Sequence, residues 1–169
     1  WESQGYNRYD GFGWYRHQFE MPAGKNDDLV LMLGNIDDID QVFVNNKLIG
    51  STGEFGKRIW SKNSYNWDEY WTELRGYEIP EGLLKPGGKN LIAVRVFDQA
   101  GNGGIYNGPL GILSLKEYKK YKNNYEYYKS IFLVNLSPHL DNGFLLLREE
   151  KSLASQVAVL HVEFYNSVN

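Results

Sequence analysis

The sequence predicts an all-β sandwich, and two observations support this fold class. Aromatic residues make up 15% of the chain and 18 of its 169 residues are glycine, a combination typical of strands that are joined by tight turns. Short apolar runs bounded by Gly, Pro and Asn also recur along the chain, whereas helical composition is scarce. We therefore expect two packed antiparallel sheets with long aromatic-rich loops.

The clearest strands lie in the first two thirds of the chain. Each is a short segment of strand-like composition, and the apolar run 29–33, which stops at Gly34, has a length that suits a strand better than a helix. Trp14 lies inside the first of these segments and is expected in the core. The segments are residues 14–20, 29–33, 75–80, 91–98 and 110–115.

A hairpin is predicted around Asn45 and Asn46. Two apolar runs, 41–44 and 47–50, flank this pair. Asparagine tolerates the positive φ that a two-residue hairpin turn requires.

The last third of the chain has a different character. Residues 123–129 have the composition of a short helix, and 131–136, 144–147 and 157–164 have that of strands. We expect residues 1–115 to form the core of the sandwich. Residues 116–169 are a divergent segment that is expected to complete it.

Composition and charge exclude several classes of function. The net charge is −3 without a block of Lys or Arg, so nucleic acid is not an expected partner. No apolar run approaches the roughly 20 residues that cross a bilayer, so no membrane partner is expected. The chain has no cysteine, which excludes disulfides and Cys-based zinc sites, and no cofactor is expected. A start at Trp1 without Met suggests a processed protein or part of a longer one, and a secreted or periplasmic location is compatible with it.

Several motifs occur along the chain in a fixed order. They are Asp10–Arg16, Leu33–Asp40, Val42–Asn45 and Asn90–Asp98. In these motifs the chain resembles the sugar-binding jelly-roll domain of family 2 glycoside hydrolases, such as β-galactosidases and β-glucuronidases, and the jelly-roll domain inside sialate O-acetylesterases. The resemblance extends to about Leu115 and implies a jelly-roll, galactose-binding-like sandwich.

The loop after Asp98 is the first candidate binding site. It combines glycines with Asn amides and one Tyr, and sugars are bound by planar polar groups and an aromatic face. The resemblance implies that this loop forms a wall of a catalytic pocket, with Asp98, Asn102 and Tyr106 facing the sugar. The alternative is a glycine-rich turn at the rim of the sandwich.

Three tryptophans in a polar stretch are the second candidate site. Trp60, Trp67 and Trp71 lie between the predicted strands in a segment rich in Gly, Ser and Asn. Aromatic residues in such a loop either pack together or stand exposed as platforms for sugar rings.

No catalytic residue and no metal ligand are assigned. Asp37, Asp38 and Asp40 are read first as residues that cap a turn, with a calcium site or catalysis as weaker readings. A glycosidase needs a pair of opposed carboxylates, which family 2 enzymes carry on a separate barrel, and a serine esterase needs a nucleophile elbow. His17, His139 and His161 lack metal-ligand spacing and are read as structural.

The expected function is that of a noncatalytic carbohydrate-binding or accessory domain of a glycan-degrading enzyme, most of all a glycoside hydrolase. Its expected partners are a carbohydrate and the catalytic domain of the parent enzyme. The alternative is a structural module without a ligand of its own, which positions a neighbouring glycosidase or sialate O-acetylesterase domain.

Overall fold

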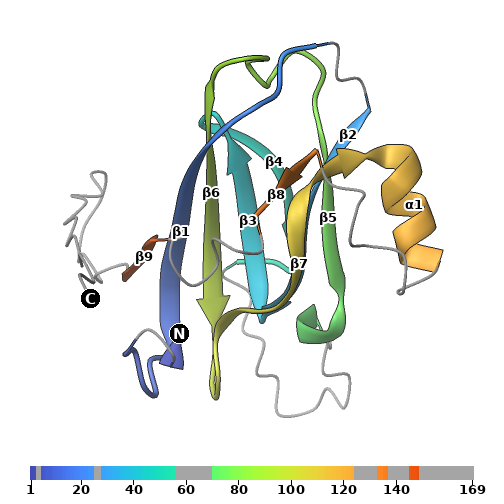
Figure 1. The fold of residues 1–169 in the computed structure, drawn as a ribbon. Coiled ribbons are helices and arrows are strands. Elements are labelled where there is room, and N and C mark those ends of the chain that lie inside the picture. Colours follow the sequence, from blue (N-terminus) through green and yellow to red (C-terminus); the bar gives the residue numbers. More distant parts are fainter. Residues whose placement is uncertain (3–4, 25–27, 56–69, 124–132, 137–144, 149–169) are drawn as a thin grey trace, which may run out of the picture.

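Two antiparallel sheets face each other in the computed structural model of the chain (Figure 1). The structure describes residues 1–2, 5–24, 28–55, 70–123, 133–136 and 145–148. The predicted all-β sandwich is confirmed. Within the described residues, no helix is long and apolar enough to cross a membrane.

Each sheet combines strands from distant parts of the chain. The five-stranded sheet has the order β4 (Lys47–Thr52), β3 (Ile39–Val44), β6 (Lys89–Asp98), β1 (Gly11–Glu20) and β9 (Leu145–Arg148). The four-stranded sheet has the order β5 (Leu74–Ile79), β2 (Leu29–Asp37), β7 (Gly104–Ser114) and β8 (Val134–Asn135). Two short helices are described, the 3₁₀ helix η2 (Tyr70–Thr72) and the α-helix α1 (Leu115–Asn123).

The apolar core lies between the two sheets, and the alternation along β1 shows which face is inside. Tyr15 and Phe19 are buried in this core. Trp14 points to the opposite face, where the guanidinium of Arg16 lies 5.0 Å from its ring centroid. The expectation that Trp14 belongs to the core is therefore wrong, because neighbouring residues of a strand face opposite sides of the sheet.

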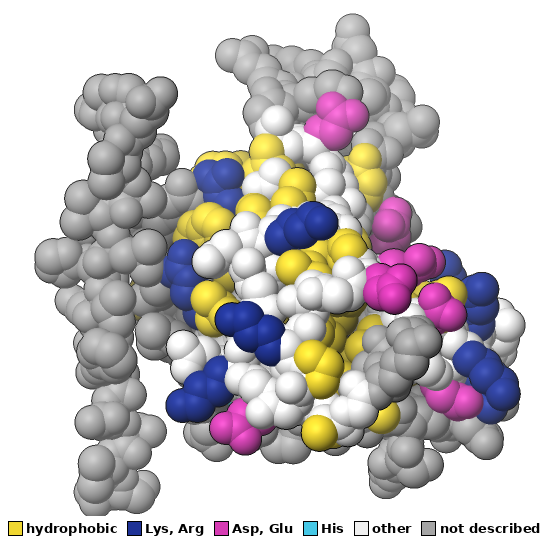
Figure 2. Space-filling model, turned by 90° about the horizontal axis from the view of Figure 1, so that it is seen from above, with side chains coloured by type: hydrophobic (Ala, Val, Ile, Leu, Met, Phe, Trp, Pro, Cys, Tyr) yellow, Lys and Arg dark blue, Asp and Glu magenta, His cyan; other side chains and the backbone are white. Residues whose placement is uncertain are grey.

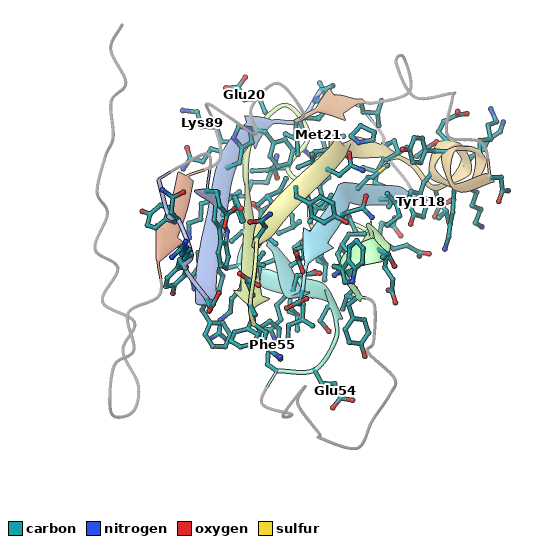
Figure 3. All side chains as sticks on the ribbon, turned by 90° about the horizontal axis from the view of Figure 1, so that it is seen from below. Glu20, Met21, Glu54, Phe55, Lys89 and Tyr118 are labelled. Atoms are coloured by element: carbon teal, nitrogen blue, oxygen red, sulfur yellow. The ribbon has the colours of Figure 1, made fainter. Side chains whose placement is uncertain are left out.

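Strand β2 is buried on both faces, which explains its unbroken apolar run. Leu31 and Leu33 contact the core between the sheets. Val30 and Met32 pack on the other side with Tyr121 of α1. Figure 3 shows α1 at the edge of the molecule, with the labelled Tyr118 on its sheet side. Helix α1 thus covers the outer face of the four-stranded sheet.

Helix α1 begins earlier than the sequence analysis expected. The predicted helix was 123–129, whereas α1 ends at Asn123 and residues 124–132 lie outside the described ones. The Oγ of Ser114 accepts the backbone N–H of Glu117 at 3.2 Å. A Ser followed three residues later by Glu is the sequence pattern of a helix start.

The predicted strands of the first two thirds are all present, but several of them are longer than predicted. Strand β1 begins at Gly11 rather than at Trp14, and β2 extends to Asp37 rather than to Leu33. Strand β7 begins at Gly104 rather than at Leu110, so Tyr106 lies in a strand and not in a loop. Of the three C-terminal strands, β8 covers part of 131–136, β9 covers most of 144–147, and 157–164 lies outside the described residues. The division into 1–115 and 116–169 stays a prediction.

The predicted hairpin is confirmed and offers a test of its turn. Asn45 and Asn46 have φ of 47° and 67°. The side chain of Asn45 donates to the carbonyl of Leu83 at 2.8 Å and accepts the N–H of Leu91 at 3.0 Å, whereas Asn46 is exposed.

We expect Asn46→Gly to raise the free energy of unfolding by about 0.5 kcal/mol, because glycine relieves the strain of a positive φ. Asn45→Gly is the matched control and is expected to lower this free energy by about 1 kcal/mol, since it removes side-chain hydrogen bonds. Urea denaturation of both variants measures the difference. A stabilised Asn45→Gly variant would contradict the assignment.

Candidate functional site

Four chain segments meet at the lower end of the sandwich in Figure 1. They are the turn between β2 and β3, the end of β6, the start of β7, and η2. We call this end the rim. Figure 3 looks onto the rim, and Figure 2 shows the opposite end, where basic and acidic side chains are both spread over the described surface.

Three carboxylates form a cluster at the rim. Carboxylate oxygens of Asp37, Asp38 and Asp98 all lie within 4.8 Å of one another. The strand register brings them together, because β3 pairs with β6 so that Ile39 lies opposite Phe97. Asp38 and Asp98 are the next residues outward from this pair.

Asp98 is the buried member of the cluster. Its side chain is fully buried, and its Oδ1 accepts the backbone N–H of Ala100 at 3.1 Å. Its Oδ2 has no hydrogen-bond partner among the described residues. A Cβ at position 103 would lie 2.5 Å from Oδ2, so only glycine lets the loop close over the carboxylate. Burial, and next the charge of Asp38, raises the pKa of Asp98 to about 7.

Asp37 shares a hydrogen bond with Asp38, its neighbour in the turn. Burial is the largest cause that raises the pKa of Asp37, to about 8, and the hydrogen bond with Asp38 is the next. Asp38 also accepts the backbone N–H of Gln99 at 3.1 Å through Oδ2. The cluster therefore retains a proton near neutral pH.

The cluster can bind either a hydrogen-bond donor or a cation. A protonated carboxyl donates a hydrogen bond and a carboxylate accepts several, which suits a hydroxyl-bearing ligand. Three carboxylates are also ligands of the type that calcium prefers. The weaker calcium reading, however, grouped Asp37 and Asp38 with Asp40, and Asp40 is not part of this cluster.

Asp40 binds a buried arginine instead. Its Oδ1 lies 2.7 Å from Nε of Arg75, and the two side chains are 0% and 1% exposed. Its Oδ2 accepts the hydroxyl of Tyr77 at 2.5 Å, and that hydroxyl lies 2.7 Å from Oγ1 of Thr52. The reading of Asp40 as a turn cap is therefore wrong, because its partners are two side chains of β5.

Two residues with exposed aromatic side chains are joined by a hydrogen bond at the rim. Trp71 of η2 is 47% exposed and Tyr106 of β7 is 49% exposed. The hydroxyl of Tyr106 donates to the backbone carbonyl of Trp71 at 2.6 Å. Burial, and next the charge of Asp37, raises the pKa of Tyr106. The pair forms the aromatic part of the rim.

Asparagine side chains fix the turn that carries Trp71. Nδ2 of Asn35 donates to the carbonyls of Thr72 and Glu73 at 3.0 and 3.2 Å. Oδ1 of Asn35 in turn accepts Nδ2 of Asn107 at 3.0 Å. Polar groups of β2 and β7 thus hold the turn in place.

The structure brings part of the predicted site together. Asp98, Tyr106 and Trp71 all lie at the rim. Asn102 is exposed on the turn between β6 and β7. Trp60 and Trp67 lie outside the described residues, as do His139 and His161, whereas His17 lies in β1.

Sequence reasoning missed the polar residues that hold the rim. Asn35 and Arg75 were not singled out, and Asp37 was not connected with Asp98. The strand pairing of β3 with β6 would have revealed the carboxylate cluster, because it aligns residues about 60 positions apart. No local sequence signal distinguishes Arg75 from an exposed arginine at the start of a strand.

The fold and the rim define an all-β sandwich domain whose polar and aromatic side chains gather at one end. The family model of the β-galactosidase second all-beta domain matches residues 1–102, more than half of the chain. The chain belongs to this family of accessory all-β domains of glycoside hydrolase family 2. The resemblance to sialate O-acetylesterases stays a prediction.

Solved structures of one bacterial enzyme are similar to part of the chain. The β-glucuronidase of Ruminococcus gnavus is 24% identical, with a TM-score of 0.41, over 53% of this chain and 13% of that one. Its complex with D-glucaro 1,5-lactone matches with the same identity and TM-score over 12% of the enzyme chain. The chain thus spans a small part of these structures. No curated protein matches the chain significantly.

Proposed function

We propose that this chain is a noncatalytic domain that contributes a sugar-binding wall to a glycoside hydrolase. The observation that carries the proposal is the exposed pair of Trp71 and Tyr106 beside the carboxylates of the rim. Membership of the family supports the link with a catalytic partner domain. The activity and the substrate of the whole enzyme are part of this proposal.

The chemistry of the rim suits a sugar. An aromatic ring stacks on the apolar face of a pyranose, and carboxyl groups and amides bind its hydroxyls. Trp71 and Tyr106 supply the rings. Asp37 supplies a partly exposed carboxyl group at the same rim.

Asp98 has a second role in the proposal. The closed loop covers its carboxylate, and Oδ2 has no partner among the described residues. Burying a polar group without a hydrogen bond is unfavourable, so a hydroxyl donor that reaches Oδ2 would be favoured. We expect this contact when the loop from Gln99 to Gly103 opens towards a sugar or a partner domain.

Sugar binding is tested by replacing the exposed aromatic residues. We expect the unmodified chain to bind a mono- or disaccharide from a panel with a dissociation constant on the order of 0.1 to 1 mM, as a small open contact would give. Trp71→Ala or Tyr106→Ala is expected to weaken this binding at least about fivefold, because stacking area is lost. Isothermal titration and tryptophan fluorescence measure the affinity.

Two controls separate binding from folding and from catalysis. Leu48→Ala removes a side chain that is equally exposed, at 49%, but lies on β4 away from the rim, and should leave the affinity unchanged. The chain should hydrolyse neither nitrophenyl glycosides nor nitrophenyl acetate above background. If the folded chain binds no sugar, the alternative holds, in which the domain only positions a neighbouring catalytic domain.

A further inference from the structure

The guanidinium of Arg75 is buried and every one of its N–H groups has an acceptor. The side chain is 1% exposed, and Nε donates to Oδ1 of Asp40 at 2.7 Å. Arginine offers five N–H donors in one plane. The remaining four point to the backbone carbonyls of Ile36, Asp38, Tyr70 and Glu73.

Two of these carbonyls flank Asp37. Nη2 of Arg75 donates to the carbonyl of Ile36 at 3.0 Å and to that of Asp38 at 2.8 Å. The residue between them carries the partly exposed carboxyl group of the rim. Arg75 therefore fixes the backbone on both sides of Asp37.

The other two carbonyls enclose the turn of Trp71. Nη1 of Arg75 donates to the carbonyl of Tyr70 and, at 2.8 Å, to the carbonyl of Glu73. Trp71 and Thr72 lie between these two residues. One planar group thus joins the turn that carries a rim carboxylate to the turn that carries an exposed ring.

We propose that Arg75 is a positioning residue that fixes the distance between the Asp37 carboxyl group and the Trp71 ring for ligand binding. The role of the two rim residues in sugar binding rests on the proposed function, whereas the positioning itself does not. Lysine cannot replace Arg75, because its three donors share one nitrogen and cannot reach both turns. The buried carboxylate of Asp40 holds the guanidinium in the required orientation.

Arg75→Lys tests the proposal with two measurements. Backbone amide exchange of residues 36–38 and 70–73 is expected to become at least about tenfold faster, because both turns lose their shared anchor. Sugar affinity is expected to fall about tenfold, because one of the groups that contact the sugar is no longer well placed. The exchange rates report on positioning even if no sugar binds to the unmodified chain.

Asn90→Ala is the matched control. Asn90 is 2% exposed and bonds to Asn45, Lys85 and Gly88 at the start of β6, whereas the rim lies at the end of this strand. The Asn90→Ala variant should have a lower melting temperature, but its amide exchange rates at residues 36–38 and 70–73 and its sugar affinity should be unchanged. The proposal is overturned if Arg75→Lys lowers the melting temperature and leaves exchange at both turns as in the unmodified chain.

A measurement on the unmodified chain covers the case in which Arg75→Lys does not fold. Slow rotation of a guanidinium that is fixed on both sides gives separate Nη–H signals for Arg75 in ¹⁵N NMR, and the proposal requires them. Averaged Nη–H signals would show a rotating group and would overturn it. Absence of sugar binding by the unmodified chain, together with slow exchange at both turns, would instead count against the proposed function alone.

Discussion

Asp40→Ala is expected to lower the free energy of unfolding by about 3–5 kcal/mol, because it leaves the buried guanidinium of Arg75 without its counter-charge. Domains of this size are stable by only about 5–15 kcal/mol, so the loss is a large part of the total. The hydroxyl of Tyr77 loses its acceptor in the same variant. Urea denaturation measures the effect.

A double-mutant cycle separates the ion pair from general packing loss. Arg75→Met alone also removes the pair and leaves Asp40 with Tyr77 as its remaining donor among the described side chains. The loss of unfolding free energy in the double variant should be smaller than the sum of the losses in the two single variants, by more than about 1 kcal/mol, since no unpaired charge remains. Additive effects would show that Asp40 and Arg75 contribute to stability independently.

The sequence predicts the fold where local signals agree with tertiary structure. The hairpin at Asn45 and Asn46 is found because its turn residues and its flanking runs indicate the same structure. Trp14 is assigned to the wrong face of its strand, because the two-residue alternation of side chains does not show which face is buried. The bounds of α1 are missed because composition alone does not mark a helix start, whereas the cap formed by Ser114 and Glu117 does.

The site is predicted less completely, because its parts meet through long-range pairing. The acidic run from Asp37 to Asp40 is visible in the sequence, yet its members separate: Asp40 faces Arg75 and the other two face Asp98. This division follows from the register of β3 against β6 and from the burial of Arg75. Neither can be read from one sequence, since both depend on which strands become neighbours.

The carboxylate cluster is expected to make the domain more stable at acidic than at alkaline pH. The pKa is about 8 for Asp37 and about 7 for Asp98 in the folded state, against about 3.9 for an unperturbed Asp in the unfolded chain. The folded state therefore binds more protons than the unfolded state between these values. The stabilisation by these protons is complete below about pH 4 and is lost as the pH rises through 7 and 8.

Between pH 5 and pH 9 we expect the free energy of unfolding to fall by about 2–4 kcal/mol, a range that allows for solvent screening of the partly exposed Asp37. Asp37→Asn keeps a hydrogen-bond donor for Asp38 but carries no charge. It should therefore be more stable than the unmodified chain at pH 9 and should flatten the pH profile, whereas Glu81→Gln, at an exposed site, should not. Urea midpoints at intervals of one pH unit measure both effects. A profile that rises towards pH 9, or one that Asp37→Asn leaves unchanged, would show that the cluster does not hold a proton in the folded state.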